Sequence, residues 1–149
     1  MQSYSQIYGS GAKELITAAA IHDMDSLKWF IEVQGLAVDA TYDEKPTALC
    51  YSLIKPNHCM MKYLIYHGAD IMHSDGLGMT PLHYAALGGC EYCVSYLISL
   101  GAQINHETKN GKTPLALIEN RENQNSCCEY LERNGACTVA KKIPIKKMH

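Results

Sequence analysis

The chain has 149 residues, of which 47% are hydrophobic and 19% are charged. This is the composition of an ordinary globular protein of about one domain, and it excludes a disordered chain. The net charge is −2, but residues 1–140 carry nine Lys or Arg and fifteen Asp or Glu, whereas residues 141–149 carry four Lys and no acid. The body of the chain therefore lacks a basic surface, and we expect no nucleic-acid partner.

The cysteines and the apolar runs indicate the compartment. The seven cysteines are odd in number and lie mostly in helical patterns, unlike those of a secreted disulfide framework. Residues 1–14 lack the basic and apolar regions of a secretory signal, and no run approaches the roughly 18 apolar residues of a membrane span. We therefore expect a cytoplasmic protein without a membrane span, with the nucleus or the interior of a host cell as alternatives.

The sequence repeats itself with a period of 33 residues. TPL at 80–82 recurs as TPL at 113–115, and the same register reaches back to Thr47 and Gly35. One such unit cannot bury its own apolar face, so stacked units are expected. We predict an N-terminal segment, four units and a basic tail, over about 1–12, 13–41, 42–74, 75–107, 108–137 and 138–149.

The first two units depart from the common pattern. The first lacks a Thr-Pro start, as an N-terminal capping unit would, and it has one extra residue before Gly35. The second has Lys45 where a turn glycine belongs, Ala48 in place of proline and Cys50 in place of histidine. The sequence therefore defines the loop and the helix start of the second unit less sharply.

The third unit has the clearest helix signals. Thr80 suits a helix N-cap, and Pro81 follows at the first helical position. Gly88-Gly89 ends this short helix, and a second helix with apolar residues at i, i+3 and i+4 ends at Gly101. The fourth unit repeats the Thr-Pro start but is polar over 120–125, which is typical of a C-terminal capping unit whose outer face meets water.

These matches resemble the ankyrin-repeat family over roughly residues 13–137. TPLHYAA at 80–86 and LISLGAQIN at 97–105 are close to the family pattern throughout. The resemblance implies an all-α ankyrin-repeat solenoid of about four helix-turn-helix units with β-hairpin loops. It also implies that His83 hydrogen-bonds the backbone and ties neighbouring units together.

No motif in the chain requires catalysis. Cys90 and Cys93 form a CxxC, a spacing that redox and zinc sites use, but a zinc site needs about four ligands and there is no second CxxC. We therefore interpret both as structural residues of a second helix. A phosphate-binding glycine loop and a GxSxG elbow are also missing. We expect a non-enzymatic chain without cofactor, metal site or small-molecule substrate.

The resemblance also implies a partner-binding surface. Partners of ankyrin folds bind the concave side, at the hairpin tips and the exposed positions of each first helix. Carried over residue by residue, with Tyr84 added as a neighbouring anchor, this surface comprises Asp43, Glu44, Ile54, Lys55, Leu77, Met79, Tyr84, Leu87, Leu100, Lys109, Lys112 and Arg121. We expect the aliphatic members to face water and form an apolar centre between an acidic and a basic edge. The alternative is that some of them only pack between hairpins.

The predicted function is a monomeric protein–protein interaction module, an adaptor, inhibitor or effector whose partner is another protein. The alternative is a regulatory subunit of an enzyme complex with catalysis in another chain. A stand-alone module should co-purify with one partner in stoichiometric amount, whereas an enzyme should have a deep pocket with converging polar groups.

Overall fold

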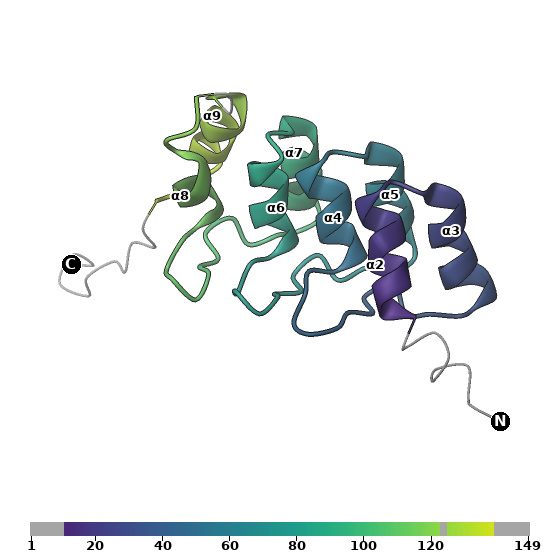
Figure 1. Ribbon diagram of the computed structural model, residues 1–149. Coiled ribbons are helices and arrows are strands. Elements are labelled where there is room, and N and C mark those ends of the chain that lie inside the picture. Colours follow the sequence, from purple (N-terminus) through teal and green to yellow (C-terminus); the bar gives the residue numbers. More distant parts are fainter. Residues whose placement is uncertain (1–10, 123–124, 139–149) are drawn as a thin grey trace, which may run out of the picture.

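The computed structural model describes residues 11–122 and 125–138, so most of the predicted N-terminal segment and of the basic tail lies outside the described residues (Figure 1). Helices follow one another in pairs, and no strand occurs within these two ranges. We call them the first to the fourth pair: α2 (Ala12–Ala20) with α3 (Met24–Lys28) and η1 (Trp29–Val33), α4 (Ala48–Ile54) with α5 (His58–Tyr66), α6 (Pro81–Leu87) with α7 (Glu91–Ser99), and α8 (Pro114–Ile118) with α9 (Asn125–Arg133).

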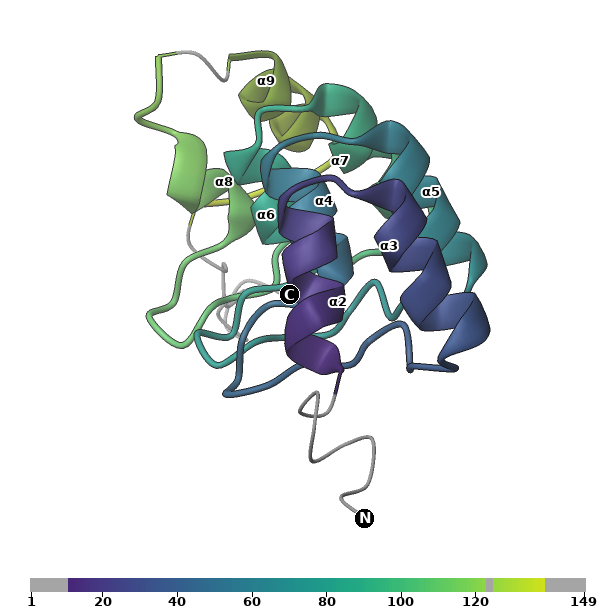
Figure 2. The ribbon, with the colours of Figure 1, turned by 45° about the vertical axis from the view of Figure 1, so that its right-hand side comes forward.

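The pairs stack side by side in two layers. Helices α2, α4, α6 and α8 form the inner layer and the second helices of the pairs form the outer layer (Figures 1 and 2). The loops that connect successive pairs all extend from the same end of the stack. This arrangement confirms the predicted all-α repeat solenoid. No helix within the described residues has both the length and the apolar character needed to cross a membrane.

The inner helices begin where the sequence predicts. Thr80 and Thr113 are extended N-cap residues, and a proline opens the helix after each of them. The Thr113 hydroxyl accepts a hydrogen bond from the Ala116 amide at 3.2 Å. Thr47 has the same extended backbone before α4, although alanine follows it instead of proline. The helix start of the second pair is therefore as regular as the others, because the N-cap conformation does not depend on the proline.

The outer helix of the first pair accommodates the extra residue of that unit in a π-helical turn. Asp23 caps α3 by accepting a hydrogen bond from the Ser26 amide at 3.1 Å. The helix then widens into the π-helical segment η1, where the Gln34 amide bonds to the Trp29 carbonyl at 3.1 Å, five residues back. A π-helical turn accommodates one more residue than an α-helical turn. The chain therefore reaches Gly35 in register with the later pairs.

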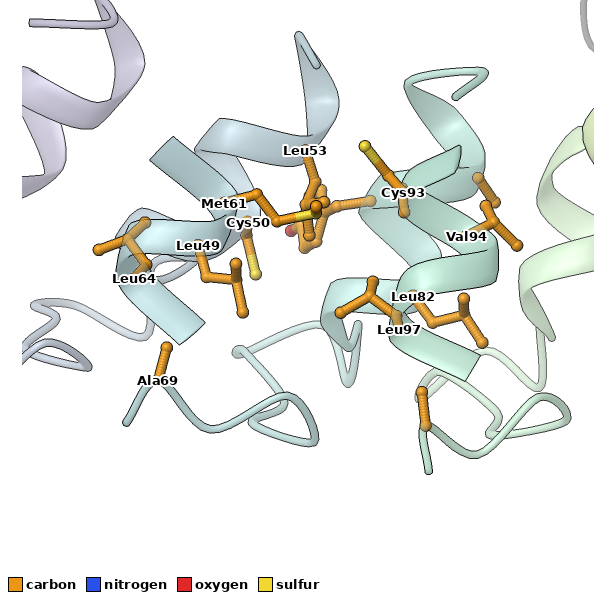
Figure 3. Close-up of a cluster of buried hydrophobic side chains, with 14 of the residues drawn as sticks. Leu49, Cys50, Leu53, Met61, Leu64, Ala69, Leu82, Cys93, Val94 and Leu97 are labelled. Carbon is orange, nitrogen blue, oxygen red and sulfur yellow. The ribbon is translucent and has the colours of Figure 1, made fainter. Parts of the chain in front are cut away.

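The core runs without interruption between the two layers. Leu49, Leu53 and Leu64 of the second pair and Leu82 and Leu97 of the third belong to one cluster of buried side chains, and each is at most 1% exposed (Figure 3). The inner helices approach so closely that a Cβ atom on Gly88, just past α6, would lie 2.2 Å from the Leu53 carbonyl oxygen. A glycine is therefore required at this contact between pairs.

Candidate partner-binding surface

Three loops lie side by side and present charged and apolar residues in a fixed order. The Gly76 amide donates to the Glu44 carbonyl at 2.9 Å, and the Lys109 amide donates to the Leu77 carbonyl at 3.0 Å. These bonds link the loop of the second pair to that of the third, and the third to the fourth. We call the surface formed by residues 43–44, 76–78 and 109–112 the loop edge.

The central loop of this edge is held in place by hydrogen bonds to the buried Asp75. One carboxylate oxygen of the buried Asp75 accepts hydrogen bonds from the Leu77 amide at 2.9 Å and the Met79 amide at 3.0 Å. Its other oxygen accepts a hydrogen bond from the Tyr84 hydroxyl. Burial and this bond to Asp75 raise the pKa of the Tyr84 hydroxyl, which therefore stays protonated. The loop is thus shaped before any partner arrives.

Leu77 on the loop edge has acidic residues on one side and basic residues on the other, whereas Arg121, predicted for the basic side, does not belong to this edge. Leu77 is 63% exposed, and it lies between the exposed acidic pair Asp43 and Glu44 on one side and the exposed Lys109 and Lys112 on the other. An apolar residue flanked by charges of opposite sign has the anatomy of a small interface with a polar rim.

Other predicted surface residues lie at the far end of the inner helices. Ile54, which ends α4, is 42% exposed, and Lys55 and Arg121 are exposed as well. Leu87, which ends α6, is half-buried and packs against the core. Between these residues and the loop edge, α6 is buried from Pro81 to Ala86. These residues are therefore separated from the loop edge and do not form one continuous apolar centre with it.

The expectation that every aliphatic member faces water is wrong at Met79. Its side chain is only 9% exposed, because the turn closed by Asp75 directs it into the core. Tyr84, predicted as an anchor, is 8% exposed, and its hydroxyl is already bonded to Asp75. Leu100 is 45% exposed but follows the outer helix α7, away from the inner helices.

His83 connects the third pair to the fourth. Its Nδ1 atom accepts a hydrogen bond from the Thr80 amide at 3.1 Å, so the ring proton lies on Nε2, which donates to the Lys112 carbonyl at 3.0 Å. Burial lowers the pKa of this imidazole, which keeps it neutral in this arrangement. The tie between units that the resemblance implied for His83 is confirmed, and it also fixes the backbone beneath the basic part of the loop edge.

The sequence interpretation missed a second group of side chains, which are of types that can ligate a metal. His58, at the start of α5, has its Nε2 atom 3.2 Å from the Cys90 sulfur at the start of α7. The CxxC of Cys90 and Cys93 therefore has a histidine beside it. The repeat register contained the signal, because His58 follows Asn57, which occupies in α5 the N-cap position that Cys90 occupies in α7.

Comparison with known proteins agrees with this architecture. A family model of ankyrin repeats, built of three copies, matches residues 15–108 and 57–142, which together cover most of the chain. No curated protein matches the sequence. Ankyrin repeats are modules for protein–protein interaction and are generally not catalytic. The chain belongs to the ankyrin-repeat family.

Proposed function

We propose that this chain is a stand-alone interaction module, acting as an adaptor, inhibitor or effector, and that it holds a partner protein at the loop edge. The observation that carries the proposal is the exposure of Leu77 between loops of opposite charge. A leucine that is 63% exposed on a loop fixed by Asp75 offers an apolar anchor without cost to the core.

The rigidity of the loop edge supports a docking role. Each of its loops is bonded to its neighbour through the backbone, and the third is tied to the fourth a second time through His83 and Lys112. A preformed surface loses little conformational freedom on binding, so more of the contact energy appears as affinity. The acidic and basic rims would orient a partner that carries the opposite arrangement of charges.

The test compares two substitutions of exposed apolar residues. A partner recovered by affinity capture from cell lysate is titrated against the wild-type chain, Leu77→Asp and Tyr66→Asp. Tyr66, on the outer helix α5, is 86% exposed and lies outside the loop edge, so its replacement is the matched control. We expect Leu77→Asp to abolish binding and Tyr66→Asp to leave it within about twofold, since central apolar anchors dominate interface energies.

Circular dichroism should show that both variants keep the wild-type fold, because neither side chain is buried. Equal affinity of the Leu77→Asp variant and the wild-type chain would refute the loop edge as the binding surface. Leu87→Asp is unsuitable as a test, because Leu87 packs against the core and its replacement would disturb the stack.

A further inference from the structure

Three side chains of types that can ligate metals converge where two outer helices begin. His58 is the first residue of α5, Cys90 is the N-cap residue of α7, and Cys93 lies in the first turn of α7. The candidate ligand atoms of these three residues all lie within 4.8 Å of one another. They lie at the end of the helix pairs opposite the connecting loops, so they belong to a surface separate from the loop edge (Figure 1).

The ligand atoms, at most 4.8 Å apart, need to close by up to about 1 Å to reach the spacing of a tetrahedral ion. With Zn–S bonds of about 2.3 Å and Zn–N bonds of about 2.0 Å, neighbouring ligands of a zinc ion stand roughly 3.5–3.8 Å apart. The His58 Nε2 atom and the Cys90 sulfur are 3.2 Å apart, which leaves a shift of a few tenths of an ångström to admit the ion. Two thiolates and one imidazole are also a soft donor set, which favours zinc over the hard cations.

The surroundings hold the histidine and leave His58 and part of Cys90 open to solvent. The His58 ring lies against the Tyr92 ring with 4.6 Å between their centroids. The Lys62 ammonium lies 5.3 Å from the centre of the Tyr92 ring on the other helix, which further links α5 to α7. His58 is exposed, Cys90 is half-buried and Cys93 is fully buried. An ion would therefore enter from the solvent side and be held against the protein by Cys93.

Helix capping accounts for only part of this arrangement. The Cys90 sulfur accepts a hydrogen bond from the Cys93 amide at 3.3 Å, as an N-cap residue does. The equivalent N-cap positions of the first two pairs hold Asp23 and Asn57, which supply oxygen acceptors. Cysteine keeps the acceptor and adds a thiol, and the amide that donates to that sulfur orients it as a ligand.

We propose that His58, Cys90 and Cys93 form a zinc site that links the outer helices of the second and third pairs. Binding would release the protons of the two thiols, so that Zn²⁺, two thiolates and a neutral imidazole carry no net charge. The buried Cys127 does not belong to the group of atoms within 4.8 Å, so we assign the fourth position to water. The link would act where α5 and α7 contact each other much less than α4 and α6 do.

Calorimetric titration of the reduced full-length chain with zinc chloride tests the site. We expect one site in the wild-type chain and at least tenfold weaker binding in His58→Ala, Cys90→Ser and Cys93→Ala. Loss of a partner outside the coordination sphere already costs about 10–100-fold, so loss of a ligand should cost no less. Cys90→Ser keeps an oxygen acceptor for the N-cap, so this variant should fold as the wild-type chain does.

Cys59→Ser is the matched control, because Cys59 is an exposed thiol next to His58 that lies outside the group. It should bind zinc as tightly as the wild-type chain. Cobalt supplies a second readout, since a thiolate-to-cobalt absorption band should appear in the wild-type chain and weaken in Cys90→Ser. Zinc binding that is equally strong in Cys90→Ser, or the lack of this band in the reduced wild-type chain, would overturn the proposal.

Discussion

The second and third helix pairs have the same architecture but are joined to their neighbours by different polar groups. In the third pair, His83 bonds to Thr80 of its own helix start and to the Lys112 carbonyl of the next pair. At the same register in the second pair, Cys50 accepts only a weak hydrogen bond from the Thr47 hydroxyl, at 3.5 Å. The helix still begins at the same register position, so the imidazole is not needed to start it.

The loops of the second and third pairs also differ in the residues at which they turn. The third loop turns at Gly78, where a positive φ of 76° suits glycine, whereas the second loop turns at Asp43 and Glu44, whose φ values are 48° and 54°. Residues with a side chain pay a conformational cost in that region. The comparison indicates that the buried leucines determine how the pairs stack, whereas glycine in the loop and histidine at the helix start stabilise the connection between neighbouring pairs.

The largest expected effect comes from the leucines that the two pairs share. Leu49 and Leu82 occupy equivalent positions on α4 and α6 and are at most 1% exposed. Each replacement by alanine should lower the free energy of unfolding by about 2–5 kcal/mol, because it removes apolar contacts and leaves a cavity. Urea denaturation measures both, with the exposed Ile54→Ala as a control that should change stability by less than about 0.5 kcal/mol.

A small loss for Leu49→Ala beside a full loss for Leu82→Ala would show that the second pair is packed less tightly than the third. The shared role of buried leucines would then not hold.

His83 and Cys50 occupy equivalent positions in the two pairs, and their replacement should have unequal effects. His83→Ala removes the donor to Lys112 and the acceptor for Thr80, both in buried surroundings, so it should cost about 1–3 kcal/mol. Cys50→Ala removes a small buried thiol with one weak bond and should cost about 1 kcal/mol. Chemical denaturation of the two variants gives the comparison. Equal losses would mean that the bridge to the fourth pair contributes nothing beyond packing.

Much of this architecture could be predicted from local rules, and the exceptions have a common physical cause. Thr80 and Pro81 start a helix because N-cap geometry depends on adjacent residues alone. The burial of Met79 and Tyr84 depends on Asp75, whose side chain closes the turn above them. A repeat alignment transfers an average exposure for each position, so it does not register a turn closed by one particular side chain.

The proposed zinc ligands also depend on a contact between residues that are far apart in the sequence. His58 and Cys90 are 32 residues apart, one less than the repeat period, so stacking brings the first residue of one outer helix beside the cap of the next. A search of the sequence for a second CxxC misses such a pair. A search for metal ligands at separations near 33 residues would have found it.

The contribution of His83 to the free energy of unfolding should depend on pH. Burial holds the pKa of His83 below its unfolded value of about 6.5, so the unfolded chain binds more protons in this range. The stabilisation from neutral His83 is therefore complete above about pH 6.5 and declines as the pH falls towards the folded pKa. The nearby His106 ring, 6.2 Å away, acts in the same direction, whereas Asp75 opposes it.

Measured between pH 7.5 and 5, the free energy of unfolding should fall more steeply for the wild-type chain than for His83→Gln. Glutamine is a neutral acceptor at this position of the helix start, so it preserves capping and removes the titration. Loss of the imidazole bond to the Lys112 carbonyl lowers its stability by an amount that does not depend on pH, so the slopes of the two profiles are compared and not their heights. Parallel pH profiles for the two chains would show that His83 titrates as it does when unfolded. Cys50, the equivalent residue of the second pair, has no charge change there, because a thiol ionises above this range and burial raises the pKa of Cys50 further, to about 12.

The smallest expected effect lies in the loop of the second pair. A residue with a side chain in the left-handed region destabilises the folded state by roughly 1–2 kcal/mol. Glycine avoids this cost, but its greater freedom in the unfolded chain lowers the free energy of unfolding by about 0.5–1 kcal/mol. Glu44→Gly should therefore raise the free energy of unfolding by up to about 1 kcal/mol, since the Glu44 carbonyl that accepts from Gly76 is retained. The opposite change, Gly78→Ala, should destabilise the chain, because a Cβ atom there would lie 2.8 Å from the Lys109 nitrogen. Thermal denaturation of both variants decides the point: a loss of stability in Glu44→Gly would mean that the glutamate side chain, packed over Gly76, contributes more than its backbone strain costs.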